Sequence, residues 1–131
     1  MDNGAPVSSN PDANNMALLV WILTIFLGFI PGLIFFLTQK NDPYVQDQSK
    51  EALNWSITVM IACVAIGVIF FILGLVAASL GIGLLFGVIS LLGTLLWLAI
   101  FVANLVICIM GAMACSKGQA YRCMYALRLV K

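Results

Sequence analysis

Four cysteines carry the most reactive side chains of this 131-residue sequence: Cys63, Cys108, Cys115 and Cys123. No two of them have the C-x-x-C spacing of common metal and redox motifs, and the sequence contains no histidine. We therefore expect no metal and no cofactor, and we interpret the thiols as reduced, small apolar side chains. Acylation of Cys115 or Cys123 beside a membrane is one alternative, and an enzyme that uses one of these two thiols is another.

The polar residues inside the apolar segments are uncharged, so they offer hydrogen bonds rather than acid–base chemistry. They are Thr24, Asn54, Ser56, Thr58, Ser90, Thr94 and Asn104. Intramembrane enzymes and pumps place ionisable side chains at membrane depth despite the cost of burying charge. Residues 57–114 contain no Asp, Glu, Lys, Arg or His, which argues against an enzyme. We expect Asn104 to hydrogen-bond a neighbouring helix, with a position in the lining of a pore as the alternative.

Two long uncharged segments must position these side chains, and they indicate an integral membrane protein. Of all residues, 63% are hydrophobic and 8% are charged, which is too little polar surface for a soluble globule. A helix needs about 20 residues to cross a hydrocarbon core about 30 Å thick. Residues 16–38 suffice for one crossing, whereas residues 57–114 must fold back. The sequence predicts an all-α integral membrane fold with three transmembrane helices over 16–38, 57–78 and 84–114.

Local signals predict how these helices begin, bend and turn. Pro31-Gly32 should kink the first helix, because proline removes a backbone donor. Asp42-Pro43 is typical of a helix start, so the cytoplasmic loop 39–56 should contain a short helix that leads into the second span. Two glycines predict a tight turn over residues 79–83.

The distribution of charge predicts the orientation in the membrane. All six Lys and Arg residues lie in 39–56 and 115–131, so the loop and the interfacial C-terminal tail should face the cytoplasm. Residues 1–15 lack Lys and Arg and should form a flexible extracytoplasmic tail. We expect a multi-pass protein of the bacterial cytoplasmic (inner) membrane, with its N-terminus outside and its C-terminus in the cytoplasm. Dividing 57–114 into three crossings of about 17 residues gives a four-span alternative.

Aromatic residues near the predicted ends of the spans should mark the membrane interfaces. We expect Tyr44, Trp55, Tyr121 and Tyr125 at the cytoplasmic interface and Trp21 at the opposite one. The basic residues of the C-terminal tail are explained by topology, so we expect no nucleic-acid partner.

Small residues within the second and third spans should let helices approach closely. Four of them share one face of the second span and two form a G-x-x-x-G pair: Cys63, Gly67, Gly74 and Ala78, then Gly83 and Gly87. We expect these faces to pack the second span against the third. Self-association uses the same chemistry and is the alternative.

Two motifs resemble those of a widespread family of bacterial three-helix membrane proteins. One runs from Gln39 to Trp55, and the other from Gly118 to the C-terminus. The residues that carry the resemblance are Asp42, Pro43, Lys50, Glu51, Asn54, Gly118, Tyr121, Arg122 and Arg128. That family is distantly related to the Tic-twenty component of the chloroplast inner-envelope protein import apparatus. The resemblance implies a cytoplasmic loop and C-terminus but no reaction.

The sequence favours a non-enzymatic role. We expect a scaffold or accessory subunit that packs with itself or with a larger membrane complex. The alternative is a homo-oligomeric pore, or a transport or import-related component, with Ser90, Thr94 and Asn104 toward its lumen. The expected partners are the lipid bilayer and either a second copy or another membrane protein.

Overall fold

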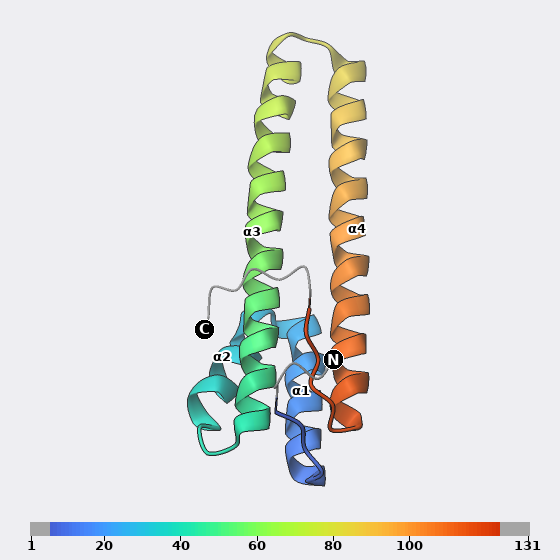
Figure 1. Ribbon diagram of the computed structural model, residues 1–131. Helices are drawn as coiled ribbons and strands as arrows, with labels where there is room; N and C mark the ends of the chain where they lie inside the picture. Colours follow the sequence, from blue (N-terminus) through green and yellow to red (C-terminus); the bar gives the residue numbers. More distant parts are fainter. Residues whose placement is uncertain (1–5, 124–131) are drawn as a thin grey trace. The chain divides into compact units, whose positions relative to one another are not determined.

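The computed structural model describes residues 6–123, and the regular secondary structure in this range is entirely helical (Figure 1). The helices are α1 (Pro11–Leu27), α2 (Phe29–Thr38), α3 (Pro43–Ser79) and α4 (Gly83–Ser116). The predicted all-α class is confirmed. The chain divides into two compact units. The base unit comprises the described parts of 1–58 and 104–131, and the hairpin unit comprises 59–103.

Helix α1 begins earlier than expected, inside the segment predicted to be a flexible tail. The Asn10 side chain accepts a hydrogen bond from the backbone N–H of Asp12 at 3.0 Å, which caps the helix. Pro11 takes the first helical position, where a missing N–H costs nothing. An N-cap followed by proline therefore starts the helix five residues before the apolar segment at Met16.

The predicted kink at Pro31-Gly32 is wrong, because the chain breaks at Gly28 instead. Gly28 has φ 69° and ψ −126°. Residues with a Cβ atom rarely adopt this conformation, whereas glycine adopts it readily. Pro31 lies in the first turn of α2, where the backbone donors have no helical acceptor in any case. Gly32 is buried, and an added Cβ would lie 3.1 Å from Ser49 O and from Leu53 N. Gly32 thus lets α2 pack closely against α3.

Helix α3 begins at the Asp42-Pro43 signal and continues unbroken to Ser79. One carboxylate oxygen of Asp42 accepts hydrogen bonds from the backbone N–H groups of Tyr44 at 3.0 Å and Val45 at 3.2 Å. The short helix expected in the loop and the second span are therefore one element of 37 residues.

Only two helices of the described chain are long and apolar enough to cross a membrane, rather than the three predicted. At about 1.5 Å per residue, α3 and α4 are about 56 and 51 Å long. Helices α1 and α2 have 17 and 10 residues and are about 26 and 15 Å long, short of a core about 30 Å thick. The break at Gly28 divides the predicted first span into two pieces.

The start of α1 lies beside the end of α4. The backbone N–H of Ser8 donates a hydrogen bond to the carbonyl of Gly118 at 2.9 Å. Gly118 has φ 73°, and a Cβ there would collide with Ser8 O, so glycine is required on both counts. This contact does not fit the predicted arrangement, which put segments 1–15 and 115–131 on opposite faces of a membrane.

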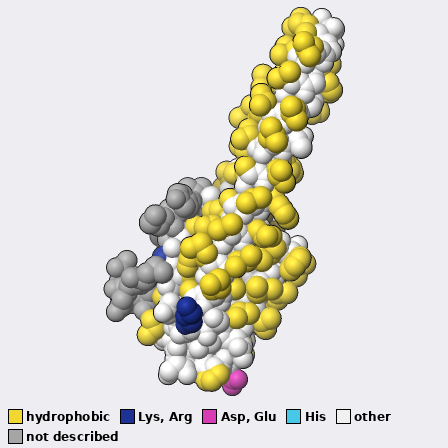
Figure 2. All heavy atoms as spheres, turned by 90° about the vertical axis from the view of Figure 1, so that its right-hand side faces the viewer, with side chains coloured by type: hydrophobic (Ala, Val, Ile, Leu, Met, Phe, Trp, Pro, Cys, Tyr) yellow, Lys and Arg dark blue, Asp and Glu magenta, His cyan; other side chains and the backbone are white. Residues whose placement is uncertain are grey.

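The hairpin unit is the pair of antiparallel helical segments joined by the short turn after Ser79 (Figure 1). Gly81 has φ 69°, and the backbone N–H of Ile82 donates to Ala77 O at 3.2 Å, which closes the end of α3. On the face shown in Figure 2, hydrophobic side chains run along the hairpin and no charged side chain appears there. The sequence of residues 59–103 contains no charged residue.

Candidate functional site

The base unit contains a polar cluster formed by α3 and the segment that follows α4. We define this polar cluster as Asp47, Gln48, Glu51, Arg122 and Cys123. Asp47 and Glu51 are four residues apart, so they lie on the same face of α3. The side chain of Glu51 is 1% exposed, and a buried carboxylate needs partners.

Arg122 and Cys123 each supply a partner for this carboxylate. The guanidinium of Arg122 donates to Asp47 Oδ1 at 2.8 Å and to Glu51 Oε2 at 3.3 Å. The backbone N–H of Cys123 donates to the other oxygen of Glu51 at 2.9 Å. Burial alone would lower the pKa of Arg122, but the hydrogen bond and charge of Asp47, followed by those of Glu51, raise it. The polar cluster therefore holds the segment after α4, at Arg122 and Cys123, against the first turns of α3.

Gln48 connects the polar cluster to α1. Its side-chain oxygen accepts hydrogen bonds from Trp21 Nε1 at 3.2 Å and from the thiol of Cys115 at 3.5 Å. Its amide nitrogen donates to Asp47 Oδ2 at 3.2 Å and to the Tyr121 carbonyl at 3.5 Å. The Gln48 side chain is fully buried, and its hydrogen-bonding atoms are all used. Sequence reasoning did not single out this residue.

Trp21 lies in the core of the base unit, and its predicted place at the membrane interface opposite the cytoplasm stays a prediction. It is completely buried, and its ring meets that of Tyr121 edge-on, with 5.3 Å between centroids. Burial, above all, raises the pKa of Tyr121 to about 12. Tyr44 is also buried, and its hydroxyl donates to the Gln119 carbonyl at 2.7 Å.

The residues of the two sequence motifs meet in the base unit. Asp42 and Pro43 start α3, and Asn54 is buried one turn beyond the polar cluster. Lys50 is half-buried on α3, and Arg128 lies outside the described residues. The motifs therefore mark a folded contact between α3 and the segment after α4.

The side chain of Asn104 connects α3 to α4. Its side-chain oxygen accepts a hydrogen bond from Trp55 Nε1 at 2.9 Å and lies 3.6 Å from the thiol of Cys108. An acceptor held in this way satisfies an indole N–H that would otherwise be unpaired in an apolar setting. Cys108, Cys115 and Cys123 are all buried, and Cys63 is half-exposed.

The small residues of the hairpin unit fall into two groups. Gly67 and Gly74 face aromatic rings of the opposite helix, where an added Cβ would lie 3.7 Å from Trp97 and 3.6 Å from Phe86. At Gly83 and Gly87 a Cβ would meet nothing within 4 Å. The G-x-x-x-G pair is therefore open, and it makes no close contact within the described chain.

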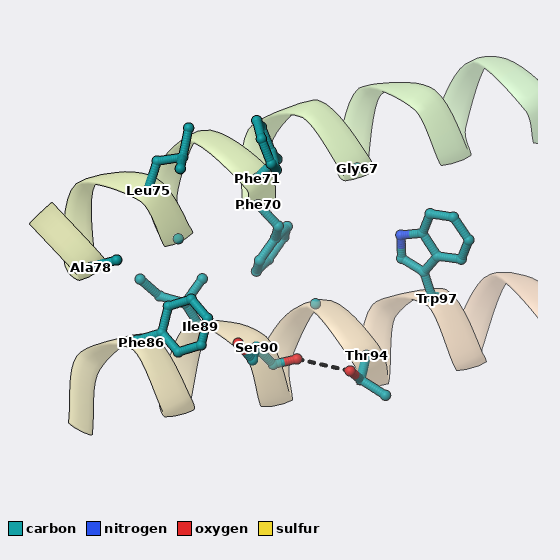
Figure 3. Close-up of a pocket in the computed structure, with 12 residues that line it drawn as sticks. Gly67, Phe70, Phe71, Leu75, Ala78, Phe86, Ile89, Ser90, Thr94 and Trp97 are labelled. Carbon is teal, nitrogen blue, oxygen red and sulfur yellow. Dashed lines mark hydrogen bonds between the residues drawn. The ribbon is translucent and has the colours of Figure 1, made fainter. Parts of the chain in front are cut away.

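An apolar groove runs between the two helices of the hairpin unit (Figure 3). Its volume is about 610 Å³. Among its lining residues are Gly67, Phe70, Gly74, Ala78, Phe86 and Trp97. The hydroxyl of Thr94 donates to the backbone carbonyl of Ser90 at 2.8 Å, so this hydroxyl is paired within its own helix. Such a surface suits apolar groups, either lipid or another helix.

Two long apolar helices and a base held together by buried polar contacts define the chain as a helical membrane protein. The chain belongs to the magnetosome magnetite crystal formation protein family, MamF/MmsF, which matches residues 12–130. The resemblance to the Tic-twenty-like family is therefore wrong, because the motifs on which it rested lie almost wholly inside this match. Comparisons with curated proteins and with solved structures gave no match.

Proposed function

We propose that this protein acts in magnetite crystal formation as a non-enzymatic scaffold of the magnetosome membrane, packing with itself or with a larger membrane assembly. The family match over residues 12–130 is the observation that carries the proposal. The engagement of Arg122 with Asp47 and Glu51 supports a structural use of these charges.

In this proposal α3 and α4 cross the membrane, and the end of the base unit that carries its charged residues faces the cytoplasm. Three exposed or half-buried lysines belong to the base unit: Lys40, Lys50 and Lys117. Cytoplasmic ends of membrane helices carry an excess of Lys and Arg, so this end should remain in the cytoplasm. The turn at Leu80–Ile82 would then reach the opposite face.

The open surfaces of the hairpin unit supply the packing. Gly83 and Gly87 lie one helical turn apart with free space above both, which lets a second helix approach closely. The groove lined by Gly67, Gly74 and Ala78 offers a further apolar surface. Membrane helices associate through such close contacts, because lipid provides no hydrophobic driving force between them.

The test combines cell biology with a mass measurement. In magnetosome-forming cells, removing the chain should change the number or size of magnetite crystals seen by electron microscopy, and returning it should restore them. The protein should fractionate with membranes. In mild detergent it should have a mass above that of a monomer, or carry a stoichiometric partner. Unchanged crystals, or a monomer without a partner, would overturn the proposal.

A further inference from the structure

We propose that α1 and α2 form a re-entrant hairpin, which enters one leaflet of the bilayer beside the base of α3 and returns to the side from which it came. The surface it offers binds the acyl chains of that leaflet. This inference rests on the proposed crossing of the membrane by α3 and α4.

Both ends of the α1–α2 pair are fixed at the same end of the base unit. The start of α1 is tied to the segment after α4 by the hydrogen bond from Ser8 N–H to Gly118 O at 2.9 Å. The end of α2 is tied to the first turn of α3, because the Gln46 side-chain amide donates to Phe36 O at 3.2 Å. The segment between them therefore leaves and returns on one side.

The tip of the pair reaches only part of the way through a bilayer. The hydroxyl of Ser56 on α3 donates to the Gly28 carbonyl at 3.2 Å, which fixes the level of the tip along α3. Ser56 is about 20 Å along the helix from Pro43 at about 1.5 Å per residue. With α3 entering the hydrocarbon core near its charged first turns, a tip at this level lies inside a core about 30 Å thick and does not emerge on the far side.

The amide group of Gly28 at the tip has hydrogen-bond partners, which matters for a break at membrane depth. The N–H of Gly28 donates to Thr24 O at 3.1 Å, and its carbonyl lies 3.2 Å from the Ser56 hydroxyl, whose single proton it shares with Ala52 O at 2.9 Å. The Thr24 hydroxyl donates to Val20 O at 2.6 Å, so this buried polar side chain is also satisfied. A non-helical residue can therefore reside in the leaflet without unpaired groups at its own amide.

The outward surface of the pair is apolar and exposed. Exposed side chains at the tip and along α2 are Phe26, Leu27, Ile30, Leu33, Ile34 and Leu37. Phe26 is 77% exposed, whereas Pro31 and Gly32 on the opposite face are buried against α3. No charged residue occurs between Asp12 and Lys40. A patch this large would be costly in water and is stable against acyl chains.

Labelling with a membrane-impermeant maleimide separates this topology from three spans. Single cysteines are placed at exposed positions, in the variants Val7→Cys, Leu80→Cys and Lys117→Cys. Labelling of the parent protein measures the background reaction of its own four thiols. Val7→Cys and Lys117→Cys should react from one side and Leu80→Cys from the other. If Val7→Cys were labelled from the same side as Leu80→Cys, the re-entrant hairpin would be overturned, but the crossing of α3 and α4 would not. Reaction of Leu80→Cys and Lys117→Cys from one side would overturn the crossing of α3 and α4.

Spin labels then report what covers the tip. A spin label at Phe26→Cys or Ile34→Cys should collide readily with dissolved oxygen. Its collision rate with a water-soluble nickel chelate should be at least about tenfold lower than that of a label at Val7→Cys. Nickel access equal to that of Val7→Cys would place the surface in water and overturn the proposal. A label that neither reagent reaches would mean that a protein, such as a second copy, covers the surface, which also overturns it.

Discussion

Gly111 of α4 lies directly against the indole ring of Trp21 of α1, with no room for a side chain between them. The contact joins the first and last helices of the base unit, and it holds Trp21 where its Nε1 reaches Gln48. Glycine here lets the two helices approach closely, so the base should be sensitive to one added methyl group.

Replacing Gly111 by alanine should destabilise the base unit. The added Cβ would overlap the Trp21 ring, and overpacking of this kind costs about 1–3 kcal/mol. Thermal unfolding can be followed with a thiol-reactive fluorescent dye, because the buried Cys115 and Cys123 react only when the base opens. The matched control is Gly67→Ala, whose Cβ would make an ordinary contact at 3.7 Å and should raise stability by about 0.5–1 kcal/mol. Equal unfolding temperatures for the two variants would contradict the close contact.

Replacing Glu51 by alanine should release the segment after α4. The change leaves the Cys123 N–H without its acceptor and removes one of the two carboxylates that bind Arg122. An unsatisfied buried group costs about 1–3 kcal/mol, so the thiol of Cys123 should react markedly faster. Lys50→Gln, a neutralising change on the same helix, serves as the control. Slow thiol reaction in both variants would show that the polar cluster does not hold this segment.

Replacing Gly28 by alanine should strain the break between α1 and α2. Nothing lies within 4 Å of a Cβ at this position, so only the backbone conformation at φ 69° opposes the change. Such conformations cost of order 1–3 kcal/mol for residues other than glycine. The neighbouring Leu27→Ala, at an exposed position, should cost less in the same dye assay. If Gly28→Ala lost no stability, the result would contradict the break and indicate a continuous helix through residue 28.

Alkaline pH should weaken the base through Tyr121. The folded state raises the pKa of Tyr121 to about 12 from an ordinary value of 10.0, chiefly by burial. Between these two values the unfolded chain has lost the phenolic proton and the folded chain retains it. Stability is therefore fully present below about pH 10 and falls as the pH rises toward 12. Tyr121→Phe should unfold with a shallower pH dependence over this range, and an unchanged slope would argue against burial of the phenol.

Part of the fold could be predicted from the sequence because single residues dictated it. Asp42-Pro43 supplied both a cap and a favourable first residue, so α3 starts where expected. The turn after Ser79 needed a glycine at positive φ, and Gly81 provides it. The all-α class followed from the length of the uncharged segments, which alternate in no strand-like pattern.

The break at Gly28 and the position of Trp21 could not be predicted in the same way. A glycine within an apolar helix usually costs only stability, whereas Pro31 carried the stronger signal for a bend. Tertiary contacts decided between them, since Gly32 must pack on α3 and Gly28 must meet Ser56. In sequence Trp21 looks like an interfacial residue, and the pattern does not reveal its complete burial, its ring contact with Tyr121 or its hydrogen bond to Gln48.

The central claim is that the protein supports magnetite crystal formation by packing through its open hairpin. The most direct measurement is the size distribution of magnetite crystals, by electron microscopy, in cells whose only copy carries Gly83→Leu and Gly87→Leu. Bulky side chains should block close approach at both positions, so we predict crystals like those of cells lacking the chain, with the protein still in the membrane. Ala99→Leu, a similar enlargement elsewhere on the hairpin, should leave the crystals normal. Normal crystals with the double variant would contradict the account.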